Sequence, residues 1–336
     1  MCTADGFKLK NYPNSSSVRI LKHCLNMGTF RDCFNLALEI LVVCCKIVAS
    51  CACAGFRWLV PLDPKIVRGE IVLVTGAAGW LGRRLALEFA RRGAVLVLWD
   101  INEDGNEETA SEIREVGAEA FTYVCDCSKR MDIYKVATQV KKEVGNISIL
   151  INNAGTVAGK KFLEMSDDML KDSINVNMMA HIWTTKAFLP AMLEKNHGHI
   201  VNVTSSAGYV AINGLTDYCA SKYGAVGLSE CLLYELDTLK KDGIHLTNIV
   251  PYYFENGLFA GCNTRFSRLF PPLSSERLLK SVMQGVLTNQ PMVFIPWHIK
   301  PFIIVKTLLP VDAFITLMNF LGVTNFMENF DGKKSR

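Results

Sequence analysis

Short apolar runs alternate with longer segments of mixed polarity over much of the chain. Between Gly69 and Ile295, seven runs rich in Val, Ile and Leu predict strands, and several are apolar throughout, as strands covered on both faces are. The predicted strands are Ile71–Thr75, Val95–Trp99, Ala120–Val124, Ser148–Ile151, His199–Val203, His245–Val250 and Met292–Ile295. The segments between them are long enough for crossover helices, which predicts an α/β fold, a Rossmann-like, doubly wound parallel sheet of seven strands.

A long apolar segment precedes the first predicted strand. Between Cys33 and Phe56 only Glu39 and Lys46 are charged, and a helix of this length would measure about 36 Å, enough to cross the hydrocarbon core of a bilayer. If the segment is a helix, its polar side chains fall on one narrow arc of the helical surface. They are Asn35, Glu39, Lys46 and Ser50, and Arg57 just beyond the segment continues the arc. The pattern favours membrane attachment, as an interfacial helix, a hairpin in one leaflet or a single span. The alternative is an apolar helix packed on the globular domain.

The C-terminal stretch is apolar as well. Over residues 291–323 it is interrupted by Pro296, Pro301 and Pro310, which predict short pieces rather than one span. Two interpretations are open, a second interfacial element or a lid over an apolar pocket. The chain closes with Lys333-Lys334-Ser335-Arg336, which resembles the dilysine retrieval signal of endoplasmic-reticulum membrane proteins.

Charge and cysteine content exclude several classes of protein. The 36 Lys and Arg against 32 Asp and Glu leave a net charge of +4, which is no reason to expect a nucleic-acid partner. Seven of the 12 cysteines precede residue 60, and no CxxC pair is followed by a second CxxC or HxxxH. We therefore predict no metal site, and a chain able to bury a full core needs no disulfide framework.

Glycines follow the first predicted strand. The strand runs into Thr75-Gly76-Ala77-Ala78-Gly79-Trp80-Leu81-Gly82 and then into a helical pattern. Glycines at such a turn let the backbone approach a pyrophosphate, and the helix N-terminus supplies amides and a dipole. Asp100 follows the second predicted strand, where a carboxylate would bond the ribose hydroxyls and repel a 2′-phosphate. The predicted cofactor is therefore NAD rather than NADP.

A phenol and an ammonium recur at helical spacing farther along. Tyr218 and Lys222 are four residues apart and so share one helical face. Alone, this YxxxK pattern usually belongs to a solvated helix. Here Ser205 follows a buried strand upstream, Asn152-Asn153-Ala154-Gly155 follows the fourth strand, and Asn177 lies between them. The combination in this order is far more specific than any one member.

These residues resemble the motifs of the short-chain dehydrogenase/reductase family over about residues 69–295. Local stretches such as Trp99-Asp100-Ile101-Asn102 resemble a membrane-bound branch that contains epidermal retinol dehydrogenases and lipid-droplet 17-beta-hydroxysteroid dehydrogenases. The resemblance implies that Tyr218 is the acid/base, Lys222 lowers its pKa, Ser205 binds the substrate oxygen and Asn177 orders a proton-relay water. A free tyrosine has a pKa of about 10. A nearby cation and an oxidised nicotinamide would favour its phenolate.

The resemblance also implies the cofactor contacts. They are Gly76, Gly79, Leu81, Gly82, Asp100, Asp126, Cys127, Asn153, Ala154, Gly155, Tyr218, Lys222 and Pro251. The sequence departs from the family pattern at Trp80, where the family usually has glycine. It departs again after Pro251, where Tyr252 replaces a common glycine and Asn256 a common threonine. A bulky indole beside a pyrophosphate would obstruct it.

The function implied is NAD-dependent oxidation of a small lipophilic alcohol, first of all all-trans-retinol to all-trans-retinal. Apolar side chains after Pro251 suit such a ligand; they are Tyr252, Tyr253, Phe254, Leu258, Phe259, Phe266, Leu269 and Phe270. There are two alternatives. One is a steroid 17-beta dehydrogenase of lipid droplets, and the other is a non-catalytic membrane or lipid-droplet scaffold whose cofactor site has decayed.

The expected organisation has four segments: a polar leader (1–32), a membrane anchor (33–60), the NAD-binding short-chain dehydrogenase domain (69–295) and an apolar extension with a basic tail (296–336). By the same resemblance we expect a homodimer in contact with membrane lipid, in the endoplasmic-reticulum membrane or on lipid droplets. The helices around residues 173–195 and 216–239 would form the dimer face.

Overall fold

The computed structural model describes residues 30–60, 62–254, 258–259, 261–262, 264–268, 270–328 and 330. The chain forms two compact units, Met1–Asp63 and Pro64–Arg336. Most of the predicted leader, Asn256, Leu269 and the tail with Lys333 and Lys334 lie outside the described residues.

The first unit contains one long helix, α2 (Phe30–Leu59). Its stretch Asp32–Phe56 has a mean hydropathy of 2.2 over 25 residues and is long and apolar enough to cross a membrane. The side chains of this stretch are all exposed, which is unlike the core helix of a globular protein. The predicted apolar helix is therefore confirmed, and its apolar surface is unburied.

The second unit is built on a seven-stranded parallel sheet in the order β3-β2-β1-β4-β5-β6-β7. The strands are β1 (Ile71–Thr75), β2 (Val95–Asp100), β3 (Ala120–Val124), β4 (Ile149–Asn152), β5 (Gly198–Val203), β6 (Ile244–Pro251) and β7 (Met292–Ile295). The chain winds outward in one direction from β1 to β3 and in the other from β4 to β7, so the order reverses between β1 and β4. The predicted doubly wound fold is confirmed, and such folds bind ligands at this point of reversal.

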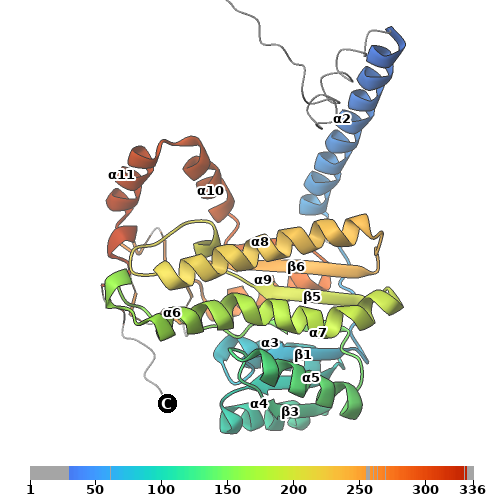
Figure 1. The fold of residues 1–336 in the computed structure, drawn as a ribbon, viewed down its shortest axis with the longest axis vertical. Helices are drawn as coiled ribbons and strands as arrows, with labels where there is room; N and C mark the ends of the chain where they lie inside the picture. The colour runs from blue at the N-terminus through green and yellow to red at the C-terminus, as the bar shows by residue number, and fades with distance from the viewer. Residues whose placement is uncertain are drawn as a thin grey trace, which may run out of the picture. The chain divides into compact units, whose positions relative to one another are not determined.

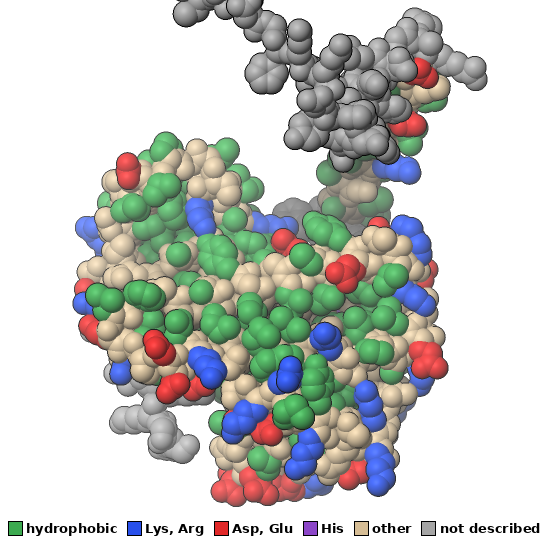
Figure 2. Space-filling model, viewed as in Figure 1, with side chains coloured by type: hydrophobic (Ala, Val, Ile, Leu, Met, Phe, Trp, Pro, Cys, Tyr) green, Lys and Arg blue, Asp and Glu red, His purple; other side chains and the backbone are tan. Residues whose placement is uncertain are grey.

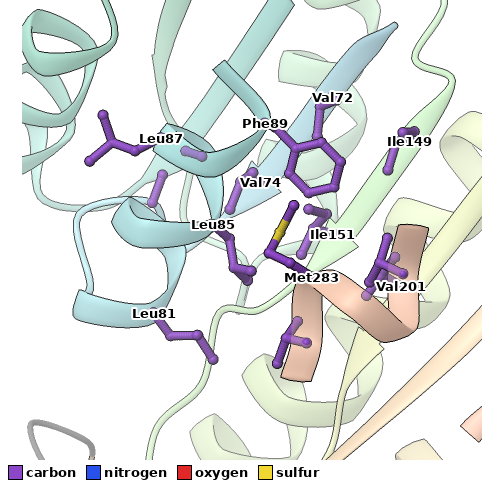
Figure 3. Packing of buried hydrophobic residues seen from close by; sticks show 14 of the residues in the cluster. Val72, Val74, Leu81, Leu85, Leu87, Phe89, Ile149, Ile151, Val201 and Met283 are labelled. Atoms are coloured by element: carbon purple, nitrogen blue, oxygen red, sulfur yellow. The ribbon is translucent and has the colours of Figure 1, made fainter. Parts of the chain in front are cut away.

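Helices cover both faces of the sheet, as Figure 1 shows. They are α3 (Trp80–Ala90), α4 (Glu103–Glu115), α5 (Arg130–Glu143), α6 (Asp167–Ile174), α7 (Ala180–Lys195), α8 (Thr216–Thr238) and α9 (Ser275–Leu287). Alternate strand residues point to opposite faces. Val72 and Val74 of β1 join a core cluster with α3, α4 and α9, whereas Leu73 joins one with α5 and α7. Figure 3 shows the first cluster, where Leu85 and Phe89 of α3 lie near Met283 of α9.

The C-terminal stretch forms a helical hairpin, α10 (Ile299–Leu308) followed by α11 (Val311–Leu321). Pro310 is the N-cap residue of α11 and separates the two helices, as predicted. Pro301, by contrast, does not break α10. It lies in the first turn, where a backbone N–H has no partner within the helix and proline is tolerated.

Candidate active site

Tyr218 and Lys222 lie one turn apart on the buried face of α8. Tyr218 is 5% exposed and Lys222 is 3% exposed. Lys222 Nζ donates a hydrogen bond to the Val203 carbonyl at the end of β5 (2.9 Å) and lies 5.6 Å from the centre of the Tyr218 ring. Ser205 follows β5 as the N-cap of a short 3-10 helix, η3 (Ser206–Gly208), and its side chain hydrogen-bonds Tyr218. The structure therefore brings these three side chains together at the C-terminal end of β5.

Burial governs the protonation of this cluster. It raises the pKa of Tyr218 well above its ordinary value, although the hydrogen bond with Ser205 acts in the opposite direction. Burial also lowers the pKa of Lys222 to about 8. At neutral pH the pair is thus a neutral phenol beside an ammonium. Burial therefore dominates the pKa of Tyr218, and the expected lowering by Lys222 is not among its causes.

Asn177 lies in a single turn of π-helix, Asn175–Met179, between α6 and α7. Its Oδ1 accepts a hydrogen bond from Thr156 N, and its Nδ2 donates to Thr156 O, both at 2.8 Å. Nδ2 also donates to Ser221 Oγ at 3.0 Å, which in turn donates to the Tyr218 carbonyl at 2.7 Å. Asn177 therefore links the loop after β4 to the turn of α8 that carries Tyr218. Such π turns recur at functional sites.

The glycine-rich turn after β1 is packed too tightly for side chains at two positions. Gly76 has a φ of +67°, and a Cβ there would lie 2.9 Å from Ala154 Cα. A Cβ on Gly82 would lie 2.2 Å from Gly76 O. Gly79 is different: it is the exposed N-cap of α3, has no side-chain cap, and a Cβ there would meet only Gly76 O at 3.3 Å. The turn thus offers an open helix N-terminus, which fits a pyrophosphate.

The other predicted cofactor residues surround this turn. Asp100, the last residue of β2, accepts hydrogen bonds from Ala78 N and Asn102 N, both at 2.9 Å. Asn153 Nδ2 donates to the Thr75 and Gly76 carbonyls at 2.9 and 3.2 Å. These bonds fasten the ends of β2 and β4 to the turn between β1 and α3. Gly155 continues the same loop, where a Cβ would lie 3.4 Å from Asn177 Oδ1.

Four predicted cofactor residues already have partners in the fold. The Leu81 and Cys127 side chains are buried in the two core clusters, so any contact they make with a cofactor would use their backbone. Pro251 ends β6 and pairs with Ile295 of β7. Asp126 Oδ1 accepts hydrogen bonds from Ser128 N and Oγ. Burial alone would raise the pKa of Asp126, but hydrogen bonds from Ser128 and Lys129 outweigh it and lower the pKa.

Trp80 is the first residue of α3 and leans toward the hydrophobic core. Its indole packs against the α3–α9 cluster, and its centroid lies 6.0 Å from that of Phe254 after β6. The tight contacts of Gly76 and Gly82, by contrast, are with Asn153, Ala154 and the turn itself. The indole therefore fills space toward Phe254 and the core, and Gly79 keeps the helix N-terminus accessible.

A largely apolar cavity of about 820 Å³ begins at Ser205. Its volume falls in the range of small-molecule sites. Four of the apolar residues predicted after β6 line it: Tyr252, Tyr253, Phe259 and Phe270. Phe254 packs on Trp80 instead, Phe266 packs on Phe320, and Leu258 joins a neighbouring apolar cluster.

Two groups of residues near the site depend on contacts distant in sequence: the C-terminal helices, for which a lid was one of two interpretations, and His181, which the sequence analysis missed. Side chains of both C-terminal helices line the cavity, among them Phe302, Val305 and Met318. The lid interpretation of this stretch is therefore confirmed for its inner face. His181 of α7 is 1% exposed beside Lys222, which together with burial lowers its pKa to about 3. Neither group has a local signal, since each meets the site through contacts distant in sequence.

A buried phenol and ammonium lie at the nucleotide-binding edge of this sheet, beside a serine that lines an apolar cavity. This arrangement defines a class of protein: the oxidoreductases built on a Rossmann-like fold. Comparisons with known proteins narrow the class. A family model described as short chain dehydrogenase matches residues 70–265. The chain belongs to the short-chain dehydrogenase family.

Individual relatives agree with that assignment. The chain is 47% identical to mouse epidermal retinol dehydrogenase 2 over 273 residues, 81% of this chain and 88% of the relative. It is 42% identical to human retinol dehydrogenase 10 over 329 residues, 90% of this chain and 96% of the relative. A short-chain dehydrogenase/reductase from Burkholderia phymatum, solved in complex with NAD, shares the fold with a TM-score of 0.65 and 23% identity. The structural match covers 72% of this chain and 94% of the Burkholderia phymatum chain.

Proposed function

We propose that the protein is an NAD-dependent dehydrogenase that oxidises all-trans-retinol, or an alcohol of similar shape, to the carbonyl compound. The observation that carries the proposal is the apolar cavity of about 820 Å³, whose wall includes Ser205, the neighbour of Tyr218. A long polyene alcohol matches such a cavity, because its apolar chain gains from leaving water while its one hydroxyl needs one polar end. Relatives named retinol dehydrogenases, aligned over nearly the whole chain, support the same substrate.

The catalytic roles follow from where each side chain lies. Ser205 lines the cavity and hydrogen-bonds Tyr218, so it holds the alcohol oxygen next to the phenol. In its phenolate form Tyr218 takes the hydroxyl proton, and the carbinol hydrogen leaves its carbon as hydride. The Lys222 ammonium stabilises the phenolate that this transfer requires. Asn177 keeps this turn of α8 in place through Ser221. NAD, when bound, supplies the hydride acceptor.

The turn after β1 would hold that cofactor. The pyrophosphate would meet the backbone of Gly76, Gly79, Leu81 and Gly82 at the N-terminus of α3. Asp100 would bond the adenosine ribose, and its charge would exclude a 2′-phosphate. The remaining predicted contacts come from the end of β6 and from loops at the same edge of the sheet: Pro251, and Asp126, Cys127, Asn153, Ala154 and Gly155.

The protein would act at a membrane as a homodimer. The apolar α2 is the proposed anchor in the endoplasmic-reticulum membrane or on lipid droplets. Hydrophobic side chains gather over α7 and α8 in Figure 2, and we assign the dimer contact to this face. Fractionation of cells and light scattering of the detergent-solubilised protein test the two assignments separately.

Retinol oxidation in membranes tests the catalytic proposal. Membranes containing the protein should form retinal from all-trans-retinol and NAD, and Tyr218→Phe should reduce the rate by about a hundredfold or more. Tyr234→Phe is the matched control, because Tyr234 lies on the same helix but is 68% exposed. Equal rates for the wild type and Tyr218→Phe would remove Tyr218 from its role. Preferential oxidation of estradiol in competition with retinol would transfer the assignment to steroids.

A further inference from the structure

The hairpin of α10 and α11 carries an exposed apolar surface, which we call the outer face of the hairpin. Its members are Ile304, Leu308, Leu309, Val311, Ile315 and Phe320. Leu308 and Val311 at the tip are 77% and 74% exposed. The two helices stand out as an arch in Figure 1, and hydrophobic side chains cover much of the same lobe in Figure 2. Contiguous apolar surface of this kind marks an interaction site.

The same helices line the substrate cavity on their inner side. Phe302 and Val305 of α10 and Met318 and Leu321 of α11 belong to the cavity wall. Val305 is 39% exposed as well, so the cavity wall and the exposed apolar surface of the hairpin meet along α10. Lys306 fastens α10 to α8 by hydrogen bonds to the Tyr209 carbonyl and the Tyr223 hydroxyl. An apolar molecule held at the outer face would therefore lie next to the wall of the cavity.

Aromatic and basic side chains mark the base of the hairpin, whereas its tip is aliphatic apart from Asp312. Trp297 precedes α10 and is 66% exposed. Lys300 lies over the Phe294 ring at 5.5 Å, and Arg265 lies over the Phe320 ring at 5.4 Å and donates to the Phe320 carbonyl. Exposed tryptophan and cations beside an apolar patch are typical of elements that enter the headgroup zone of a bilayer. Asp312, in the first turn of α11, limits this insertion to the interface.

We infer that the outer face of the hairpin inserts into one leaflet of a lipid bilayer, and that the substrate alcohol enters the cavity from that leaflet. A bilayer is the favoured occupant because α2 of the same chain is apolar enough to hold the protein at a membrane, so lipid is always at high local concentration. The cations at the base suit anionic headgroups. Only the substrate route rests on the proposed function, and the lipid contact does not.

Quenching by brominated lipid tests the lipid contact without any enzymatic assay. The full chain is reconstituted in phosphatidylcholine nanodiscs with and without brominated acyl chains, as wild type and as Trp297→Phe. The difference in fluorescence between the wild type and Trp297→Phe is the contribution of Trp297. Bromine should remove most of it, because Trp297 lies at the base of the inserted hairpin. Unchanged Trp297 fluorescence in brominated nanodiscs would overturn the inference, as would cross-linking of the outer face to a second copy or another protein.

Charges on the tip test the substrate route. The double variant Leu308→Asp/Val311→Asp should raise KM for retinol dissolved in the nanodisc by about tenfold and leave kcat unchanged. Neither residue lines the cavity, so oxidation of a short water-soluble alcohol should not change. Val116→Asp/Met131→Asp is the control, because both positions are exposed and apolar but distant from the hairpin in sequence. An unchanged KM for retinol in the tip variant would overturn the route. Absence of retinol oxidation in the wild type would overturn the proposed function and leave the quenching result to stand.

Discussion

Trp80 stands beside the predicted pyrophosphate site where the family usually has glycine. Its replacement by glycine tests directly whether the indole obstructs the cofactor. If the indole fills space toward α9, Trp80→Gly should cost stability and leave affinity for NADH within about threefold of the wild type, a change below about 1 kcal/mol. If the indole occupies the place of the pyrophosphate, the same substitution should restore binding. The two readings therefore predict opposite results for one variant.

The stability cost follows from the contacts of the indole. Full removal of a buried tryptophan costs about 3–5 kcal/mol, and Trp80 is half-buried, which leaves about 2 kcal/mol. Loss of the aromatic contact with Phe254 adds about 0.5–1.5 kcal/mol. The sum of about 3 kcal/mol corresponds to a fall in Tm of about 6–10 °C for a domain of this size. Trp80→Phe should recover more than half of it, because a phenyl ring still reaches Phe254.

The assay combines two measurements on detergent-solubilised full chain. Thermal unfolding followed by tryptophan fluorescence gives Tm, and NADH titration gives Kd. An increase in NADH affinity of about tenfold or more in Trp80→Gly, about 1.4 kcal/mol, would refute the reasoning. Together with no measurable binding by the wild type, that result would favour a scaffold with a decayed cofactor site.

Three further predictions follow from particular contacts. Gly82→Ala should abolish NADH binding in a titration and lower Tm, because its Cβ would lie 2.2 Å from Gly76 O and 2.8 Å from Asn153 Nδ2; retained affinity would contradict the tight turn. Asp100→Asn should weaken NAD binding by about tenfold and narrow the preference over NADP, measured as kcat/KM for both cofactors, and an unchanged ratio would exclude Asp100 from cofactor choice. His181 has a folded pKa of about 3 against 6.5 in the unfolded chain, so stability falls as pH drops below about 6.5. By linkage this loss is about 2 kcal/mol at pH 5, and His181→Gln should lack it in urea unfolding at pH 5 and 7.5; equal losses in both proteins would refute the buried neutral imidazole.

The periodicity of the chain was enough to predict the sheet. All seven strands appear within one residue of their predicted ends, because strands buried on both faces must be continuously apolar and are bounded by polar turns. The YxxxK spacing likewise placed Tyr218 and Lys222 on one helical face. The apolar run Val95–Trp99 placed Asp100 at the end of β2. These are local properties, which depend on residues a few positions apart.

Tertiary packing alone decided between the alternative interpretations of the C-terminal stretch and of Trp80. The apolar C-terminal stretch was equally compatible with a lid and an interfacial element, and the tertiary structure gives its inner side to the cavity while its outer side stays exposed. The direction of the Trp80 indole depends on Phe254, which is far away in the sequence. Protonation depends on packing as well, since burial raises the pKa of Tyr218 and lowers that of Lys222. The sequence alone determined the elements and the reactive side chains, because each arises from local spacing. Their surroundings were decided by the tertiary structure, because cavities, burial and electrostatics arise from contacts between distant parts of the chain.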